Sequence, residues 1–534
     1  MRHIIITGFM GTGKTTVGRD VARRLDRPFI DMDAEIEVRA LKPVSRIFAE
    51  DGEAAFRQME AALCAELCAQ PAAVIATGGG TLIDPTNRER MLSSGTVVCL
   101  TGAVDELLQR LREVGNPDRP LLNVSHPRTR MLQLLEARRE AYAAIPWQID
   151  TTGRAVAEIA AQIIHIANAV TLPVRHPGGR YDIHIGDGML AHVGSALLAG
   201  GAAAGSVVAI VSTPVVAPLY AASVEDSAAS AGLRPLLCSI PDGESYKTLQ
   251  TVAGLYQRFL TAGLDRSSAV LSMGGGVTGD IAGFAAATYM RGVRFAQLPT
   301  TLLAMVDASV GGKTGVDLAQ GKNLVGAFKQ PAWVIIDPTV LTTLPLEELR
   351  CGLAELLKHA VIGDPALFAQ LEAQVGEPLN WAQGELAPWI ARSLRVKIDI
   401  VEQDPFERGR RAVLNFGHTV GHALERLSGF ELRHGQAISV GMVAAAKIAA
   451  QLGWADPALA GRLEAVFSSW GLPVRCPPFE AEQICQALAF DKKKRGPELR
   501  WILPRAIGQV EIADSVPPEV VKAVLQGMGA GGRP

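Results

Sequence analysis

The sequence lacks the features that would assign it to several other classes of protein. Its 534 residues carry a net charge of −2, so no excess of positive charge predicts nucleic acid or a membrane surface as a partner. No apolar run approaches the roughly 18 residues of a membrane-spanning helix, and the opening MRHIIITGFMG is too short an apolar run for a signal peptide. Seven cysteines are scattered without a CxxC pair, which favours a reducing compartment. We therefore expect a cytoplasmic protein.

The composition is that of a folded chain with more than one domain. Hydrophobic residues make up 48% and charged residues 20%, which is enough to build real cores, and the length suggests two to four domains. No internal repeat or low-complexity tract is present. The stretch VTLPVRHPGG at residues 170–179 holds two prolines and two glycines, which is typical of a boundary. We predict domains at residues 1–170 and 181–534, joined by a linker at 171–180.

A phosphate-binding motif opens the first domain. Residues 3–7 form a short apolar, β-branched run that predicts a buried parallel strand. The chain continues with GFMGTGKTT and a helical pattern, which is GxxxxGK[ST] in its strand–loop–helix context. The glycines turn backbone N–H groups toward phosphate, and the helix start adds a positive end. We expect Lys14 to reach the β- and γ-phosphates of ATP and Thr15 to hold Mg²⁺. The predicted ATP-binding residues are Gly11, Thr12, Gly13, Lys14, Thr15 and Thr16.

Several further motifs follow within the same domain. They are DMD at residues 31–33, FR at 56–57, GGG at 78–80, RPLL from residue 119 and R-x3-Y from residue 138. Each arginine taken singly could be a surface charge. Together with GFMGTGKTT, these motifs resemble shikimate kinase across essentially the whole domain.

The resemblance to shikimate kinase implies specific roles for these residues. Asp33 would hold and activate the acceptor hydroxyl, and Asp31 would lie near Mg²⁺. Residues Arg57 and Arg138 would bind the carboxylate of shikimate, which suits bidentate guanidinium chemistry. Glycines and one more arginine complete the implied site: Gly79 and Gly80 would line the acceptor pocket, and Arg119 would close on the phosphates. One departure is Glu140-Ala141, where many members carry Pro-Leu.

The second domain begins with an alternation of strands and turns. Residues 206–211, 235–240 and 268–273 are predicted strands, and the last leads into GGGVTGD. A strand, a glycine-rich turn and a helix are how α/β folds seat a pyrophosphate, although this is not a GxGxxG pattern. Asp307, Lys313, Lys322 and Asn323 follow among glycines and small residues, a combination that does not fit an ordinary core.

Histidines near residue 420 form the strongest candidate for a metal site. His418 and His422 are four residues apart and share one face of a predicted helix, and His434 begins another helical run. Glu355 lies on a separate helical segment. A carboxylate and two or three imidazoles from separate helices predict a catalytic zinc site with one open position. The alternative is that these histidines are solvated or capping residues, but the glycines around them favour close approach of helices or ligands.

Residues from about 175 to 530 resemble 3-dehydroquinate synthase, through GGGVTGD, YMRGVR, LPTT, MVDASVGGKT, GKN, GLAELLKH and NFGHTVGH. The resemblance implies a Rossmann-like NAD domain at 181–340 and a helical metal domain at 341–534, with the active site between them. Zinc, with cobalt as an alternative, would be held by Glu355, His418 and His434. His422 would then contact the substrate phosphate and transfer protons.

The same resemblance implies the rest of the active site. The expected substrate residues are Asp307, Lys313, Lys322, Asn323, Lys358, Lys397, Arg411, Asn415, His422 and Lys492. Of these, a catalytic part is expected for Lys313, Lys358, Arg411, Asn415 and His422. The expected NAD-binding residues are Glu244, Lys247, Gly275, Gly276, Asp280, Thr300 and Thr301, with Asp307, Lys313 and Lys322 beside them. Arg291 would reach the site of a neighbouring subunit, so we expect a homodimer formed through this domain. One departure is Ser212-Thr-Pro214, where members often carry Asp or Asn for the ribose.

Together these patterns predict an α/β protein with two activities in aromatic biosynthesis. The kinase part would phosphorylate shikimate. The second part would convert 3-deoxy-D-arabino-heptulosonate 7-phosphate to 3-dehydroquinate and phosphate, with NAD regenerated in each turnover. One alternative is a metal-dependent polyol dehydrogenase fused to a small-molecule kinase, and another is that one half is a regulatory domain without activity. Net formation of NADH would favour the dehydrogenase, whereas phosphate release without net NADH would favour the synthase.

Overall fold

The structure is a computed structural model that describes residues 2–113, 126–374, 386–495 and 500–531. The chain folds as two compact units. The first comprises Met1–Ala169, Gly188–Ser206 and Ser223–Pro235, and the second comprises Val170–Asp187, Val207–Ala222 and Leu236–Pro534.

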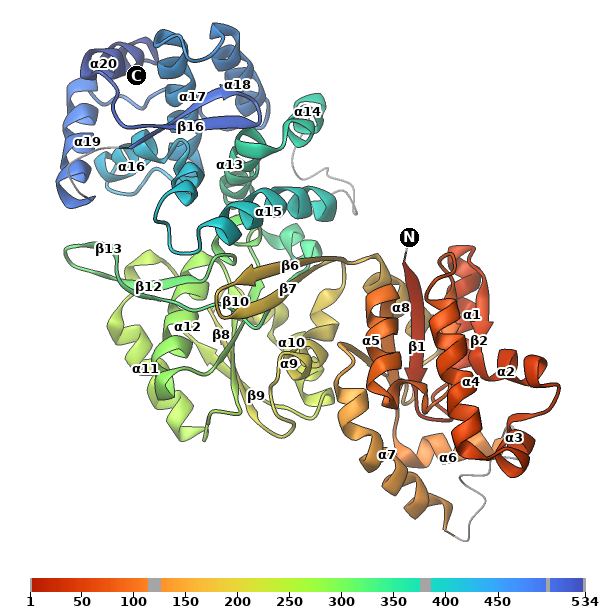
Figure 1. The fold of residues 1–534 in the computed structure, drawn as a ribbon. Helices are drawn as coiled ribbons and strands as arrows, with labels where there is room; N and C mark the ends of the chain where they lie inside the picture. The colour runs from red at the N-terminus through yellow and green to blue at the C-terminus, as the bar shows by residue number, and fades with distance from the viewer. Residues whose placement is uncertain (1, 114–125, 375–385, 496–499, 532–534) are drawn as a thin grey trace. The chain divides into compact units, whose positions relative to one another are not determined.

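A parallel five-stranded sheet organises the first unit, with strand order β2-β3-β1-β4-β5. All six residues of the central strand β1 (His3–Gly8) are buried, because helices cover both faces of a parallel sheet. Around β1 lie β2 (Phe29–Asp31), β3 (Val74–Ala76), β4 (Gly95–Thr101) and β5 (Trp147–Asp150). Figure 1 shows the flanking helices, which include α1 (Lys14–Leu25), α4 (Gly52–Leu67), α5 (Pro85–Ser94), α7 (Pro127–Ala143) and α8 (Val156–Asn168). The predicted P-loop kinase fold is confirmed.

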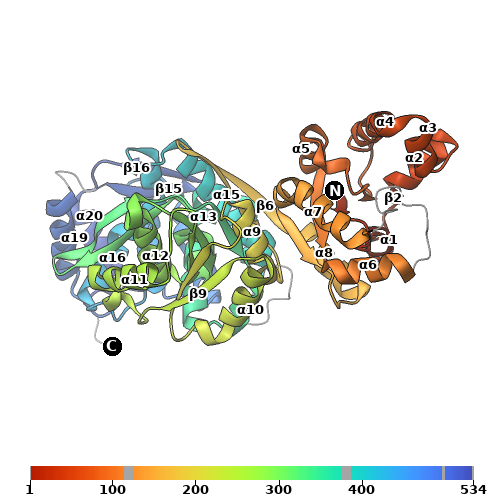
Figure 2. The ribbon, with the colours of Figure 1, turned by 90° about the horizontal axis from the view of Figure 1, so that it is seen from below.

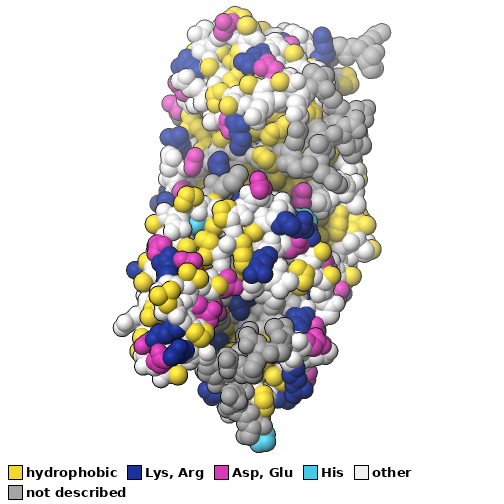
Figure 3. Space-filling model, turned by 90° about the vertical axis from the view of Figure 1, so that its right-hand side faces the viewer, with side chains coloured by type: hydrophobic (Ala, Val, Ile, Leu, Met, Phe, Trp, Pro, Cys, Tyr) yellow, Lys and Arg dark blue, Asp and Glu magenta, His cyan; other side chains and the backbone are white. Residues whose placement is uncertain are grey.

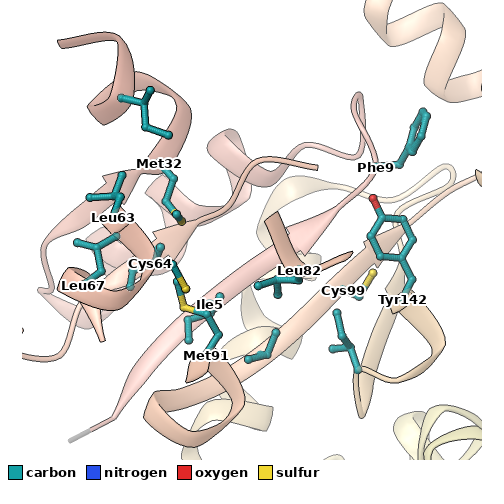
Figure 4. Close-up of a cluster of buried hydrophobic side chains, with 14 of the residues drawn as sticks. Ile5, Phe9, Met32, Leu63, Cys64, Leu67, Leu82, Met91, Cys99 and Tyr142 are labelled. Carbon is teal, nitrogen blue, oxygen red and sulfur yellow. The ribbon is translucent and has the colours of Figure 1, made fainter. Parts of the chain in front are cut away.

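The core of this unit draws side chains from the sheet and from the helices over it (Figure 4). Ile5 of β1, Leu63 of α4 and Met91 of α5 are each at most 2% exposed. Cys64 belongs to the same cluster, and burial raises the pKa of its thiol to about 12. All seven cysteines are free, which agrees with the absence of a disulfide framework in the sequence.

A seven-stranded sheet organises the second unit, in the order β6-β7-β14-β11-β10-β8-β9. Strands β7 (Gly179–Ile185), β14 (Trp333–Ile336), β11 (Arg294–Pro299), β10 (Ala269–Gly274) and β8 (Val207–Ser212) run parallel. Beyond β8 lies β9 (Arg234–Ser239). Helix α12 (Gly276–Thr288) packs against β10. The three strands predicted here, β8, β9 and β10, are confirmed with boundaries that differ by one residue.

The expected linker at residues 171–180 is instead part of a β-hairpin. Residues Val170–His176 form β6, which pairs antiparallel with β7 from Val170 opposite Ile185 to His176 opposite Gly179. Leu172 and Val174 alternate with exposed residues and are buried, as a half-buried strand requires. The two prolines in this stretch indicated a linker rather than this alternation of buried and exposed residues. Pro173 is tolerated in the strand because β6 is an edge strand.

A mostly helical part completes the second unit. Its helices include α13 (Leu346–Gly363), α15 (Leu386–Gln403), α16 (His418–Leu427), α17 (His434–Gln451) and α18 (Pro457–Ser469). Helix α17 is at the centre, because it packs on α13, α16 and α18 and buries most of its residues. Figure 2 shows α13, α15 and α16 from below, together with the hairpin of β15 (Trp501–Ala506) and β16 (Gln509–Ala513). The predicted metal-binding segments therefore lie on three neighbouring helices.

The surface carries charges of both signs. Lys and Arg side chains are interspersed with Asp and Glu side chains on the face shown in Figure 3. Surface pairs such as Arg39–Glu66 and Arg462–Glu372 join opposite charges at 2.6 Å. Within the described ranges, no helix is long and apolar enough to cross a bilayer.

Candidate functional site

The glycine-rich loop of the first unit forms at the end of β1. Gly11 and Gly13 have φ values of +83° and +88°, which L-residues with a side chain rarely adopt. Helix α1 begins at Lys14 without a side-chain cap on its free N–H groups. Lys14 Nζ donates to the carbonyls of Gly8 and Phe9 at 3.0 and 3.2 Å, so the ammonium lies over the loop. An uncapped helix start beside a lysine is suited to bind phosphate.

Two oxygen ligands suited to Mg²⁺ meet beside this loop. Thr15 Oγ1 donates to Asp31 Oδ2 at 2.7 Å. Strand β2 ends at Asp31, because Asp31 Oδ1 caps helix α2 (Met32–Ala40) by accepting from Asp33 N at 3.2 Å. Asp33 therefore lies in the first turn of α2 rather than in the strand.

The GGG segment is surrounded by the expected acceptor-binding residues. A Cβ on Gly78 would lie 2.7 Å from Asp33 Oδ1, and one on Gly80 would collide with the guanidinium of Arg57. Arg138 Nη1 donates to Gly79 O at 3.0 Å. One carboxylate and two guanidinium groups thus converge on one turn, as a polar acceptor bearing a carboxylate requires.

Helix α7 contains Glu140-Ala141, where the sequence departs from the usual Pro-Leu of shikimate kinases. The helix continues through these residues to Ala143, so Arg138 and Tyr142 share one face. Both side chains donate to Gly79 O, Tyr142 from its hydroxyl at 2.7 Å. Arg138 and Tyr142 therefore both contact the GGG turn without the Pro-Leu pair. Arg119, expected to close on the phosphates, lies outside the described residues.

A shallow surface groove runs along α1, and one of its lining residues, Thr16, adjoins the phosphate-binding loop. The other lining residues are Arg19, Asp20, Arg23 and Arg24 of α1 and Val156 and Ala157 at the start of α8.

In the second unit, the glycine-rich turn lies between β10 and α12 as predicted. Strand β10 ends at Gly274 and α12 begins at Gly276 with no side-chain cap. Thr300 N donates to Gly274 O at 3.0 Å. The Thr300 hydroxyl is buried, and Oγ1 has no hydrogen-bond partner among the described residues. A helix start and a buried hydroxyl in need of a partner fit a dinucleotide.

Charged residues gather beside this turn. Lys247 Nζ pairs with Asp280 Oδ2 at 2.6 Å and donates to Asn323 Oδ1 at 2.5 Å. Lys322 Nζ lies 3.4 Å from Glu244 Oε1. Asn323 has a φ of +55°, an uncommon conformation that is frequent at functional sites. All five residues were expected at the cofactor or substrate sites, and the structure brings them together.

A second group of charges surrounds Asp307, in a single π-turn at Ala304–Ala308. Lys397 Nζ lies 2.7 Å from Asp307 Oδ1, and Lys358 forms an ion pair with Glu355. Burial opposes the charged form of Asp307, but Lys397 and Lys358 prevail and hold its pKa well below the usual range. Two buried lysines and two carboxylates thus meet in one place, a pattern typical of functional sites.

Arg411 and Asn415 lie nearby on one short 3₁₀ segment, Arg410–Asn415. Arg411 is 3% exposed, and its Nη1 donates to Pro405 O at 2.7 Å. In the described part of the chain, no carboxylate forms an ion pair with this guanidinium. A buried guanidinium paired only with carbonyls can still bind an anion.

The candidate metal ligands come together as the sequence predicted. Glu355 of α13 is fully buried, and its Oε1 lies 3.7 Å from His418 Nε2 and 3.4 Å from His434 Nε2. Ligand atoms of the three residues all lie within 4.8 Å of one another. Oε1 has no hydrogen-bond partner within the ranges described. One carboxylate and two imidazoles with a buried oxygen in need of a partner fit a divalent transition metal.

Partners at the other ring nitrogens orient the two imidazoles. His418 Nδ1 lies 3.2 Å from Phe416 O, and His434 Nδ1 lies 3.2 Å from Glu425 Oε1. Both partners accept hydrogen bonds, so they favour the proton on Nδ1, and at His418 the lone pair of Nε2 then faces Glu355. At His434 burial is outweighed by the carboxylates of Glu355 and Glu425, which raise the pKa to about 10, so a bound metal would displace the Nε2 proton. Burial, together with Lys358, keeps the pKa of His418 well below its ordinary value, which favours the neutral ligand form.

His422 lies close to the two histidines but outside the group of three ligands. Its ring centroid is 5.1 Å from that of His418 and 6.4 Å from that of His434. A second group of possible ligands combines Glu355 with Asp307 and His359. His359 Nε2 is 3.8 Å from Asp307 Oδ1, and Lys397 already pairs with Asp307, the carboxylate that only this second group contains. The group with His418 and His434 is therefore the better metal site.

Close helix packing at glycine places the two histidines. A Cβ on Gly441 of α17 would collide with the carbonyl oxygen of Gly417, whose φ of +81° precedes His418. We expect Gly441→Ala to push α16 from α17, to lower the stability of the second unit by about 1–3 kcal/mol, and to lower its metal content. Thermal unfolding and elemental analysis would measure both.

Gly461 of α18 provides the matched control for Gly441. A Cβ there would meet nothing within 4 Å. Gly461→Ala should keep full metal content and stabilise its helix by up to about 1 kcal/mol. Equal effects of the two substitutions would show that close packing at Gly441 does not place the ligands.

Three acidic residues at these sites were missed in the sequence. Glu425 follows His418 by seven residues, so helical spacing could have revealed it. Glu60 pairs with Arg57 three residues away and accepts from Thr81 Oγ1. Glu407 pairs with Lys313 and accepts from Asn415 Nδ2 at 3.2 Å. No local sequence pattern indicates the role of Glu407, because its partner Lys313 is 94 residues away.

Two other residues expected at the synthase site, Arg291 and Lys492, have no described contact with it. Arg291 is exposed, has a φ of +68°, and makes no hydrogen bond or ion pair within the part of the chain that is described. Lys492 lies in α19 (Ala481–Arg495), but its side chain is outside the described structure.

Comparison with known families covers most of the chain. The family described as shikimate kinase matches residues 10–168. The N-terminal and C-terminal families of 3-dehydroquinate synthase match residues 237–351 and 352–494.

Individual relatives agree with these matches. The 3-dehydroquinate synthase of Rippkaea orientalis is 45% identical over 361 residues, covering 67% of this chain and 98% of the relative. That of Synechocystis sp. is 46% identical over 361 residues, covering 67% and 99%. Among solved structures, 2-epi-5-epi-valiolone synthase from Streptomyces hygroscopicus, with NAD⁺ and Zn²⁺ bound, is 31% identical with a TM-score of 0.60. It covers 65% of this chain and 96% of its own.

Proposed function

We propose that this chain, which belongs to the 3-dehydroquinate synthase family and carries a shikimate kinase domain ahead of the synthase part, catalyses two steps of the shikimate pathway, one at each of its two sites. The kinase transfers phosphate from ATP to shikimate. The synthase converts 3-deoxy-D-arabino-heptulosonate 7-phosphate to 3-dehydroquinate and phosphate. As working boundaries we take residues 1–169 for the kinase and the remainder for the synthase. Both reactions are assigned to the cytoplasm.

The assignment of residues to the kinase site rests on the contact between Thr15 and Asp31 beside the glycine-rich loop. These two oxygens would hold Mg²⁺ with ATP, and Lys14 would turn from the loop carbonyls to the β- and γ-phosphates. Arg119 would complete the ATP site. Gly11, Thr12 and Gly13 supply the loop.

Shikimate would bind at the GGG turn. Arg57 and Arg138 would clamp its carboxylate, and the lack of side chains at Gly79 and Gly80 leaves room for the two guanidinium groups beside the acceptor. Asp33, at the start of α2, would accept the proton of the attacking hydroxyl. Positioning and charge neutralisation account for most of phosphoryl-transfer catalysis.

The synthase assignment rests on the group of Glu355, His418 and His434 beside a cluster of lysines. We assign Zn²⁺ to this group, with Co²⁺ as a functional substitute, since a solved relative holds NAD⁺ and Zn²⁺ and another holds NAD⁺ and Co²⁺. When bound, the metal would lower the pKa of a substrate hydroxyl. NAD would lie at the turn of Gly275 and Gly276.

The remaining polar residues would bind the substrate and move its protons. Lys313, Lys358, Lys397 and Arg411 supply positive charge for the carboxylate and the phosphate of the substrate. The ring nitrogen of His422 would transfer a proton, and the carboxylate of Glu407 is a second candidate to accept one.

We further propose a homodimer formed through the synthase part. Arg291 supports it, because an exposed guanidinium in a left-handed backbone conformation is free to reach a neighbouring subunit. Sedimentation of the intact chain would test this assignment, and a monomer that retains full synthase activity would contradict it.

The decisive assay supplies the heptulosonate phosphate together with NAD. We expect one phosphate per substrate consumed and no net NADH, because NAD is regenerated in each turnover. Accumulation of NADH in step with substrate loss would instead identify a polyol dehydrogenase. That alternative gives no role to Lys313, Lys397 and Arg411. Lys397 supports the synthase, because it pairs with Asp307, which has a carboxylate oxygen within 4.8 Å of one of Glu355.

A further inference from the structure

Phe430 is an exposed aromatic side chain held in an unusual turn. It lies between α16 and α17, is 55% exposed, and has a φ of +67°. Gly429 before it has a φ of +62°, and Phe430 N donates to Glu425 O at 2.8 Å. A bulky residue in this backbone region is a strained exception, and such exceptions gather at functional sites.

The ring of Phe430 faces the ammonium group of Lys322. Lys322 Nζ lies 4.4 Å from the ring centroid and 3.4 Å from Glu244 Oε1. Lys322 belongs to β13 (Gly321–Phe328), whereas Phe430 lies in the turn between α16 and α17, so this contact joins two parts of the second unit. The Lys322 side chain is 41% exposed and therefore remains open to a ligand.

An aromatic face orients a lysine without neutralising it. Glu244 alone would restrain the ammonium by pairing with its charge, but a ring adds attraction through its quadrupole and leaves the N–H donors available. Since the lysine stem is long and flexible, holding it in place reduces the entropy lost when an anion binds.

The turn that carries the ring is also tied to the metal-binding group. Glu425, whose carbonyl holds Phe430 N, contacts His434 Nδ1 at 3.2 Å through its carboxylate. The backbone of Phe430 is therefore linked through Glu425 to one of the candidate metal ligands.

We propose that Phe430 is a positioning residue that holds the Lys322 ammonium for a phosphate group of a synthase ligand. The inference rests on the proposed synthase function. Two ligands carry the required chemistry, namely the pyrophosphate of NAD and the phosphate of the heptulosonate.

The test compares Phe430→Leu with Phe430→Tyr in the full-length chain. Leucine keeps apolar bulk without β-branching but removes the aromatic face, whereas tyrosine keeps the face. KM for each ligand is measured with the other saturating. In Phe430→Leu, KM should rise about two- to fivefold, as expected for losing a partly exposed cation–π contact, while kcat stays within about twofold. Phe430→Tyr should restore KM.

The two ligands are told apart by which KM rises in Phe430→Leu. A rise in KM for the heptulosonate identifies the substrate phosphate as the ligand, and a rise in KM for NAD identifies the pyrophosphate.

Trp454→Leu is the matched control, because Trp454 lies under Arg505 at 4.0 Å and Arg505 pairs with Glu511. This variant should leave both KM values unchanged. Unchanged or lower KM values in Phe430→Leu, or a tyrosine variant as impaired as the leucine variant, would overturn the proposal. Kinase activity and thermal unfolding report on folding in every variant. A wild-type chain without phosphate release would refute the synthase function itself, which separates the two failures.

Discussion

Replacing His434 by alanine is expected to abolish both metal retention and phosphate release by the second unit. His434 Nε2 is one of the two imidazole nitrogens that face Glu355 Oε1, so its removal leaves a carboxylate and one imidazole. Loss of an outer-shell partner alone lowers metal affinity or activity by about 10–100-fold, and loss of a ligand should exceed that range. Elemental analysis after dialysis and a phosphate-release assay would measure the two effects.

Two further variants calibrate the result for His434. Glu425→Gln removes only the carboxylate at His434 Nδ1, so it should weaken metal binding by about 10–100-fold while leaving the ligands in place. His126→Ala, at an exposed position of the first unit, should change neither metal content nor phosphate release. A His434→Ala protein with full metal content and full activity would show that the metal lies elsewhere.

Replacing Lys14 by methionine is expected to collapse shikimate phosphorylation while sparing the synthase. The substitution removes the only ammonium that lies over the loop carbonyls of Gly8 and Phe9 in the described structure. Removing one preorganised group that stabilises transition-state charge costs about 10²–10³-fold in kcat. A coupled assay for shikimate 3-phosphate and the phosphate-release assay would follow the two activities in one preparation.

Lys42→Met is the corresponding control for Lys14. Lys42 is a lysine of the same unit that pairs with Glu50 and Asp51 away from the loop. This variant should retain kinase activity within about twofold, since surface ion pairs contribute little. Loss of synthase activity in a folded Lys14→Met protein would mean that the two sites are not independent.

Some features of this protein follow from short stretches of sequence. The buried strand His3–Gly8, the glycines with positive φ and the helix from Lys14 form where GxxxxGK[ST] predicted them. These features depend on about ten neighbouring residues, because local sterics and helix capping determine them. The helix start at His434 and the separate helix of Glu355 were predictable for the same reason.

Other features required the tertiary structure. Histidine spacing by itself left two or three imidazoles as possible ligands. The resemblance to 3-dehydroquinate synthase implied that His422 is not one of them, and the packing of α13, α16 and α17 leaves it outside the group of three. The expected linker proved to be β6, because its pairing with β7 outweighs what its prolines indicate locally. Lys313 and Glu407 meet although 94 residues separate them.

The division between the two kinds of feature has a physical origin. Backbone conformation at a glycine or a helix start is decided within one or two turns of chain, which a sequence displays directly. Contacts between distant residues exist only after the helices and sheets have buried their apolar faces against one another. The sequence by itself therefore determined the types of site and their local frames. Packing decided which carboxylates, imidazoles and lysines share each site.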